Sequence, residues 1–247
     1  ISRLRAPLSG DLPAKVANAL LSLDRKLEGQ QQRSKQTWSE RLVELARELV
    51  RRSPEVAPAL FKHPRLATAA HVPLVEVFSP ELRDQAAWLF LVLAQRDKYF
   101  VWSGDLIKLL ARLPEREHKP LFRRHWANRG LRDDLLPPLA RNPEAKDRDL
   151  FLAGLDSTQP EVAHAAVQAL AALPRDPSPK NLPPVLRLLE RLQSEPKQGA
   201  LRKETLALLA FQSGHPFAVS EAQTDTASLK RAYQPAFDWF LQQHPVL

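Results

Sequence analysis

The side chains that most often carry out enzymatic chemistry are either absent from this sequence or poorly spaced for it. None of the 247 residues is a cysteine, which excludes disulfides, thiolate metal sites, iron–sulfur clusters and a cysteine nucleophile. A phosphate-cradling loop needs clustered glycines, so that backbone N–H groups can approach the anion. The seven glycines stand at positions 10, 29, 104, 130, 154, 199 and 214. This spacing excludes both the Walker and the dinucleotide-binding fingerprints.

Histidine also lacks a pattern suited to catalysis or metal binding. The seven histidines are His63, His71, His118, His125, His164, His215 and His244. His118 and His125 could share one face of a helix, but seven residues of helix span about 10.5 Å. A zinc ion cannot bridge that distance, because its ligands lie at about 2 Å. We therefore predict no metal site and interpret the histidines as solvated or hydrogen-bonded groups.

Two other combinations resemble catalytic groups but have a simpler structural interpretation. Asp133 and Asp134 are adjacent, and neighbouring helical positions point about 100° apart, so they do not converge as an acid–base pair would. We expect both in the first turn of a helix, where carboxylates interact favourably with the helix dipole. Ser213 stands close to His215, but the glycine between them indicates a helix end. We predict no catalytic residue and no cofactor, and hence a non-enzymatic protein.

The strongest candidate for a binding function is the basic segment from Arg96 to Arg132. Its ten cations are Arg96, Lys98, Lys108, Arg112, Arg116, Lys119, Arg123, Arg124, Arg129 and Arg132. Four acids stand against these ten, and the excess of six makes up most of the net charge of +8. The segment also contains four aromatic residues, Tyr99, Phe100, Trp102 and Trp126. Aromatic rings among cations are typical of surfaces that stack on nucleic-acid bases.

Three interpretations of this segment remain open. It could be a solvated helix face with its aromatic rings in the core, a docking site for an anionic protein, or a nucleic-acid-binding surface. The predicted partner surface consists of Lys119, Arg123, Arg124, Trp126, Arg129 and Arg132.

The glycine and proline contents favour an all-α fold. The chain has 7 glycines and 22 prolines, against about 17 and about 12 for an average composition. A β-rich chain needs glycine for hairpin turns and bulges, whereas a helical chain can use proline at helix starts. The longest apolar run, Ala86 to Ala94, predicts a buried helix. It is too short to cross a bilayer, and the first residues lack the apolar region of a signal peptide.

Helix-start signals recur at short intervals along the chain. They are the capping box TWSE from Thr37 and the motifs SPEV from Ser53, SPEL from Ser79 and QPEV from Gln159. The predicted helices are 12–27, 38–52, 54–62, 64–70, 80–95, 104–113, 117–128, 131–141, 146–155, 160–173, 181–193, 197–212 and 227–242. Pro235 should break or kink the last of them. The strand-like pieces at 72–78 and 98–102 are expected to be helix flanks or connections.

Internal repeats predict the architecture. DLIKLLARLP from Asp105 is similar to DLFLAGL from Asp149, 44 positions later, and LPPLARN from Leu136 is similar to LPPVLRL from Leu182, 46 positions later. The stretch DSTQPEVAHAAVQALAALP, residues 156–174, resembles the HEAT consensus. The matching positions are Asp156, Pro160, Val162, Ala165, Ala166, Ala169, Leu170 and Leu173, whereas Ala163 departs from the arginine usual in such repeats. The resemblance implies an α-solenoid of about five or six stacked antiparallel helix pairs.

A second resemblance concerns the end of the chain. LKRAYQPAFDWFLQQHP, residues 229–245, is similar to the helical segment that joins repeat modules to c-type haem domains in some large secreted bacterial proteins. It implies an extracytoplasmic location, although the sequence has no CxxCH motif to attach haem. We predict an N-terminal helix and linker at 1–36, a HEAT-like domain at 37–215 and a helical tail at 216–247.

Three functional hypotheses follow. The first is a non-enzymatic protein-interaction or scaffold module within a larger protein, using the concave surface of the solenoid. The second is a nucleic-acid-binding helical repeat that uses the basic segment 96–132, including one that acts on a base. The third is a structural spacer beside a redox domain.

Overall fold

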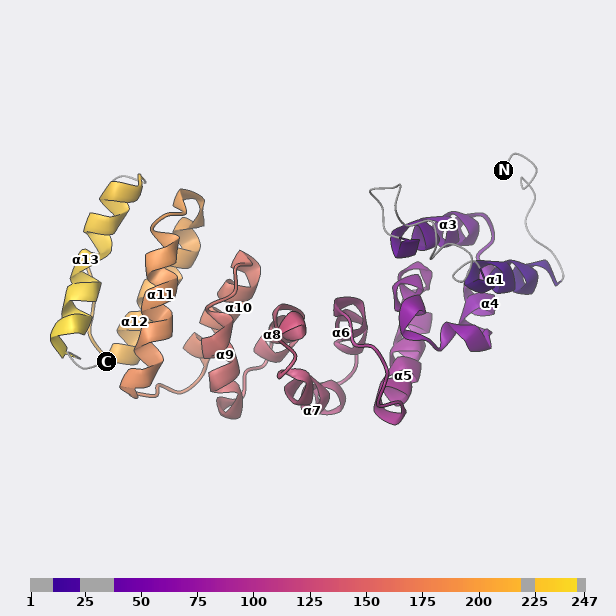
Figure 1. Cartoon of the computed structure of the whole chain (residues 1–247), viewed down its shortest axis with the longest axis horizontal. Helices are drawn as coiled ribbons and strands as arrows, with labels where there is room; N and C mark the ends of the chain where they lie inside the picture. The colour runs from indigo at the N-terminus through magenta and orange to yellow at the C-terminus, as the bar shows by residue number, and fades with distance from the viewer. Residues whose placement is uncertain (1–10, 23–37, 219–224, 244–247) are drawn as a thin grey trace. The chain divides into compact units, whose positions relative to one another are not determined.

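The computed structural model of the chain describes residues 11–22, 38–218 and 225–243. Every regular element in these ranges is helical, and no β-strand occurs in them (Figure 1). The all-α fold expected from the glycine and proline contents is thus confirmed. The chain divides into two compact units, Ile1–Arg123 and Arg124–Leu247, and we describe each by itself.

In residues 11–22 and 38–123, the first unit contains α-helices of seven to seventeen residues and two 3₁₀ segments. These are α1 (Leu12–Ser22), α3 (Trp38–Arg52), α4 (Val56–Lys62), η2 (Pro64–Leu66), η3 (Ala69–Val77), α5 (Pro80–Arg96), α6 (Gly104–Leu110) and most of α7 (Glu115–His125). The η3 segment contacts α3, α5 and α6. Pro73 lies inside η3 and has no backbone N–H to donate, which favours a 3₁₀ segment over a regular α-helix here.

In helix α5, local signals set where the helix begins, and packing sets which of its residues are buried. Ser79 caps it, accepting a hydrogen bond from the Leu82 backbone N–H at 3.4 Å, and Pro80 occupies the first turn as predicted. Phe90 is fully buried, but Trp88 is 44% exposed on the opposite face. The prediction of an entirely buried helix is therefore wrong, because its neighbours α4, α6 and η3 cover only part of its circumference.

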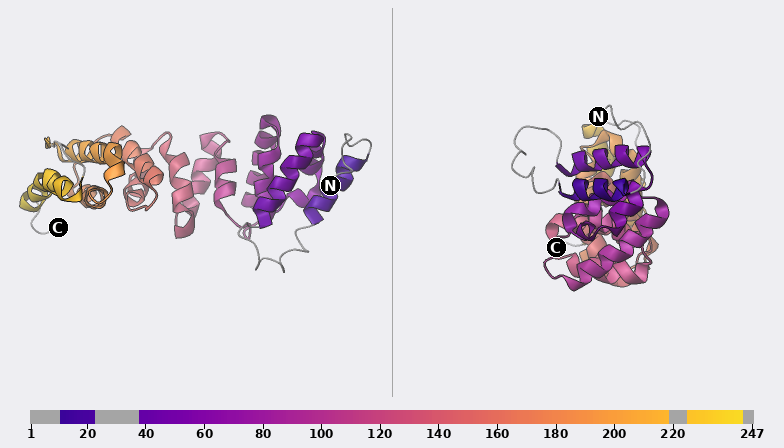
Figure 2. Two further views of the ribbon diagram at one scale, coloured as in Figure 1. Left: turned by 90° about the horizontal axis from the view of Figure 1, so that it is seen from above. Right: turned by 90° about the vertical axis from the view of Figure 1, so that its right-hand side faces the viewer.

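In its described residues, the second unit contains the end of α7, six further α-helices and short 3₁₀ turns at residues 129–131, 145–147, 179–181 and 196–198. The helices are the end of α7, α8 (Arg132–Ala140), α9 (Arg148–Gly154), α10 (Pro160–Ala172), α11 (Leu182–Leu192), α12 (Gly199–Ser213) and α13 (Thr226–Gln243). Their contacts alternate: α10 contacts both α8 and α12, and α9 contacts α11. Successive helices also pack together, as α8 with α9, α9 with α10 and α11 with α12. Figure 2 shows these helices from two further directions.

Small residues let these helices approach closely. Ala163 and Ala166 of α10 are fully buried, together with Val162 and Leu170. A Cβ atom on Gly154 of α9 would overlap the Leu136 side chain of α8 and lie 3.2 Å from the Ala166 Cβ. On the other side of α10, the His164 Nε2 atom lies 2.8 Å from a Glu204 carboxylate oxygen of α12.

Several local predictions can be compared with the observed elements. The strand-like pieces at 72–78 and 98–102 form no strand: the first lies largely in η3, and the second is a connection. The α-helix expected at 64–70 does not form: this range holds the short 3₁₀ turn η2 and the first two residues of η3. Pro235 does not break α13, which continues to Gln243. Thr37 of the predicted capping box and residues 23–27 of the first predicted helix lie outside the described residues.

Ser53 does not cap a helix as expected, because α4 begins only at Val56.

None of the described helices is long and apolar enough to span a bilayer.

Candidate functional site

Lys119 is buried and so does not belong to the predicted basic surface. Its side chain is only 4% exposed, and its ammonium lies 2.8 Å from the carboxylate of Glu115, one turn earlier in α7. The buried face of α7 comprises His118, Lys119, Leu121 and Phe122. A lysine in a basic helix is normally solvated, but tertiary packing encloses this position, so the ammonium cannot reach a partner. We correct the predicted surface accordingly.

The remaining predicted residues are divided between the two units. Arg123 is half-buried and ends the first unit, whereas the others belong to the second. There, the guanidinium of Arg132 lies 5.5 Å from the Trp126 ring centre, and its Nε donates to the Trp126 carbonyl at 3.0 Å. Arg124 and Arg129 are exposed. Within the second unit, the structure thus brings together Arg132 and Trp126, and this pair stabilises the end of α7.

Aromatic residues of the basic segment are used mainly in the core. Phe100 packs edge-on against the buried Phe90, with ring centres 6.3 Å apart. Trp102 packs in the same way against Phe122 at 6.5 Å. Tyr99 is 78% exposed, which leaves it as the ring of this connection that is available to a partner. This arrangement matches the interpretation in which the aromatic rings are turned inward.

Five arginines of the second unit donate to backbone carbonyls at or just beyond helix C-termini. The last carbonyls of a helix lack intrahelical partners and carry partial negative charge, so a guanidinium stabilises them. The donor and acceptor pairs are Arg132 with Trp126, Arg148 with Pro174, Arg175 with Gln212, Arg191 with Leu155 and Asp156, and Arg202 with Leu192 and Glu195. The positive charge of these five arginines is therefore used within the fold.

Gly214 has a specific role at one of these caps. It ends α12 with φ at 72°, in the left-handed region, as the sequence predicted. A Cβ atom at this position would also lie 2.5 Å from the Arg175 guanidinium, which covers the same helix end. The left-handed backbone conformation thus favours glycine, and the Arg175 guanidinium would have to shift to admit a Cβ atom.

The Ser213–His215 combination has a structural explanation. The Ser213 hydroxyl donates to the Ala210 carbonyl and accepts from the backbone N–H of His215. The His215 ring stacks on Trp239 of α13 at 5.1 Å, and Phe217 packs edge-on against the same tryptophan at 5.4 Å. The imidazole therefore helps to hold α13 and is not hydrogen-bonded to the hydroxyl in any contact described.

The adjacent aspartates and the histidines of α7 also have structural roles or surroundings. Asp133 and Asp134 lie in the first turn of α8, as predicted. A His118 ring nitrogen is hydrogen-bonded to the Leu113 carbonyl at 3.0 Å. Burial lowers the pKa of His125, and the neighbouring Arg124 lowers it further. Within the described ranges, no group of three or more histidine, aspartate or glutamate side chains could hold a metal ion.

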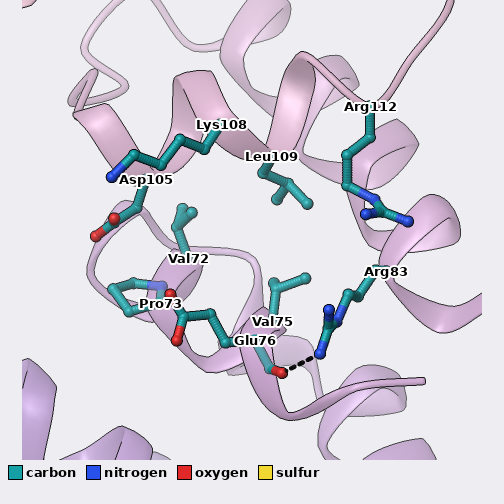
Figure 3. A pocket seen from close by; sticks show the side chains of 9 residues that line it. All are labelled: Val72, Pro73, Val75, Glu76, Arg83, Asp105, Lys108, Leu109 and Arg112. Carbon is teal, nitrogen blue, oxygen red and sulfur yellow. Dashed lines mark hydrogen bonds between the residues drawn. The ribbon is translucent and has the colours of Figure 1, made fainter. Parts of the chain in front are cut away.

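A pocket in the first unit gathers charged side chains above an apolar floor. It has a volume of about 150 Å³ and lies between η3, the start of α5 and α6 (Figure 3). Val72, Pro73, Val75 and Leu109 supply its apolar lining, and Glu76, Arg83, Asp105, Lys108 and Arg112 supply its charged lining. In Figure 3, Arg83 and Arg112 lie on one side, and Asp105 and Lys108 lie on the other.

A second pocket of about 460 Å³ adjoins the first, because the two share Pro73, Glu76 and Asp105. Its other lining residues come from α3 and are Glu40, Val43, Glu44 and Arg47. We call the two pockets together the η3 groove. Its charge changes along its length, since four acids and one arginine line the α3 end, whereas three cations and two acids line the α5–α6 end.

The arginines of the η3 groove are incompletely satisfied. The guanidinium of Arg83 donates from Nη2 to the Glu76 carbonyl, but its buried Nε has no hydrogen-bond partner among the described residues. Arg112 donates from Nε and Nη2 to one oxygen of Asp84, at 3.0 and 2.7 Å. At the other end, Arg47 lies 3.5 Å from Glu76. These contacts hold the cations at the rim while leaving donors for a ligand.

No motif in the sequence predicted the η3 groove. Lys108 and Arg112 were counted within the basic segment, but Arg83 and Glu76 lie outside it. The available signal was Pro73 inside the strand-like piece 72–78, which ruled against a central strand and left an irregular segment flanked by charges.

Comparison of the chain with family models, curated proteins and solved structures finds no match.

Proposed function

We propose that this chain is a non-enzymatic protein-binding module built from HEAT-like helical repeats. The observation that carries the proposal is the alternating contact pattern of the second unit. There, α8, α10 and α12 form one series of contacts, α9 and α11 form another, and consecutive helices join the two. Stacked helix pairs in repeat proteins pack in this manner, and their faces serve mainly to bind other proteins.

The distribution of charged groups supports a binding role. Catalysis needs titratable side chains that converge on a reacting atom with shifted pKa values. In the described ranges, the arginines, histidines and hydroxyls near one another are largely used to cap helices or to join them. Ligand binding requires no such convergence, only an open surface with complementary chemistry.

The η3 groove supplies a candidate for that surface. It combines an apolar floor with charged rims, a composition that suits the side chains of a peptide segment. Nucleic acid is favoured less, because it would meet the acids Glu40, Glu44 and Asp105 at the α3 end.

Binding assays on the purified chain test the proposal. We expect selection from phage-displayed random peptides to yield sequences that bind with saturable heat release in calorimetry. We also expect no mobility shift of labelled duplex DNA or single-stranded RNA at about 50 mM salt, where phosphate contacts are strong.

A different outcome would support the nucleic-acid hypothesis instead. In that case the nucleic acid shifts, its affinity falls steeply with salt, and the double variant Arg124→Glu/Arg129→Glu abolishes the shift. Failure to recover any binding peptide would overturn the proposed function.

A further inference from the structure

We propose that the η3 groove binds a peptide segment of a partner protein that carries opposite charges at its two ends. A carboxylate next to a small aliphatic group occupies the Arg83–Arg112 end, and a cationic side chain occupies the Glu40–Glu44 end. This inference rests on the proposed protein-binding function and specifies the chemistry of the partner.

The first observation is the unsatisfied donor on Arg83. A guanidinium has five N–H groups and no acceptor, so each buried N–H requires an oxygen. The Nε of Arg83 is buried and has no acceptor among the described residues, while the side chain lines the pocket and no contact of its Nη1 is described. Leaving a buried charged donor unpaired is unfavourable, and native structures seldom do so without a ligand or a water. A carboxylate oxygen is the strongest acceptor for this group.

The second observation is the position of Arg112 in the same pocket. Its Nε and Nη2 both contact one oxygen of Asp84, and no contact of its Nη1 is described. The side chain is 38% exposed, which keeps the remaining donor accessible. Asp84 also fixes the guanidinium, so less side-chain entropy is lost when a ligand binds. Arg83 and Arg112 can therefore both donate hydrogen bonds to the oxygens of a single carboxylate.

The third observation is the size and apolar character of the pocket floor. Val72 and Val75 are buried beneath it, and Leu109 lines its wall. The pocket, at about 150 Å³, has room for a short aliphatic group beside a carboxylate.

The fourth observation is the reversal of charge along the groove. Beyond Pro73 the lining becomes acidic, with Glu44, Glu76 and Asp105 facing the single cation Arg47. Complementary potentials fix the direction of a bound segment as well as its affinity. A simple anion would gain nothing from the acidic end, whereas a peptide with a cation at one end and a carboxylate at the other would use both.

Peptides selected by phage display on the whole chain provide the test. We expect the selected sequences to share an acidic residue beside an aliphatic one, and a lysine or arginine on one consistent side of it. In calorimetry, Arg83→Met and Arg112→Gln should each weaken the best peptide at least about tenfold, because a charge-assisted contact is lost. Arg116→Glu is the matched control, since its side chain is 83% exposed and lies outside the groove.

Charge reversal makes the test specific. The Arg112→Glu variant should lose the selected peptide but bind its counterpart in which the acidic residue is replaced by lysine. Circular dichroism verifies that each variant is folded. The unchanged affinity of Arg116→Glu shows that charge reversal outside the groove has no effect. If peptides bind but Arg83→Met, Arg112→Gln and Arg112→Glu leave the affinity unchanged, this inference is overturned while the proposed function stands. If the chain selects no peptide at all, both are overturned.

Discussion

The two units use charged side chains in different ways. In the second unit, arginines reach across to backbone carbonyls at the ends of other helices, as Arg191 and Arg202 do. In the first unit, arginines mainly contact carboxylates near the surface, as in the pairs Arg112–Asp84 and Arg47–Glu76. A cation whose donors bind carbonyls at a helix end cannot also bind a partner, whereas a cation at a groove rim can. The contrast indicates that a high positive charge alone is weak evidence for a binding site.

The largest expected difference between the units concerns a capping arginine of the second unit, Arg202, and a groove arginine of the first, Arg83. Arg202 is 0% exposed and donates to the carbonyls of Leu192 and Glu195. Arg202→Met should lower the free energy of unfolding by at least about 3 kcal/mol, because buried carbonyls lose charged donors. Arg83→Met, in the first unit, should lower it by less than about 1 kcal/mol, since that side chain is half-buried and one of its donors is unsatisfied.

Urea unfolding followed by circular dichroism measures both effects. Lys203→Met is the control for Arg202→Met, because Lys203 is an exposed neighbour in the same helix. Equal losses for Arg202→Met and Arg83→Met would contradict the contrast between the units.

A second prediction tests the close packing of the second unit. Gly154→Ala places a methyl group against Leu136 and Ala166, so it should destabilise the protein by about 1–3 kcal/mol despite the higher helix propensity of alanine. Gly130→Ala is the matched control, since its new methyl group would meet only Asn128, at 3.6 Å. We expect the control to change stability by less than about 0.5 kcal/mol. Thermal unfolding that ranks the two variants in the opposite order would refute the close approach of α8, α9 and α10.

The smallest effect concerns Asp176, beside a capping arginine of the second unit. A hydrogen bond from Asn181 holds its pKa below the ordinary value of 3.8, helped by the Ser178 N–H and by the charge of Arg148. A carboxyl with a depressed folded-state pKa stabilises the fold above its unfolded pKa, and this contribution disappears as the pH falls through the folded value.

Asp176→Asn should therefore lower the unfolding midpoint slightly at pH 7, and the difference from the original chain should vanish in strong acid, well below pH 3.8. Thermal unfolding over a pH series measures this. A difference that persists unchanged in acid would show that the carboxylate charge has no part in it.

The amount of the fold that follows from sequence differs between regions. Proline and glycine signals predicted α5, α10 and the end of α12 closely, because caps and left-handed positions depend on a few neighbouring residues. The helix predicted at 64–70 failed, since the choice between α and 3₁₀ structure around η2 and η3 depends on contacts with α3 and α5. Local propensity is too weak to decide such a segment.

The candidate site was the least predictable feature. The sequence shows that Lys119 lies in a basic stretch, but not that α7 would bury its side chain. It likewise cannot show that Arg83 and Arg112 line one pocket, because their approach depends on how α5, α6 and η3 pack together.

The sequence by itself determined the helical class, most of the helix positions and the absence of cysteine chemistry. These properties follow from composition and from interactions within a few residues. Only the tertiary structure decided which cations are caps, which are buried and which face the η3 groove. The reason is physical: the role of a charged side chain depends on the acceptor that folding brings to it, and for Arg191 or Arg202 that acceptor lies on another helix or beyond its end.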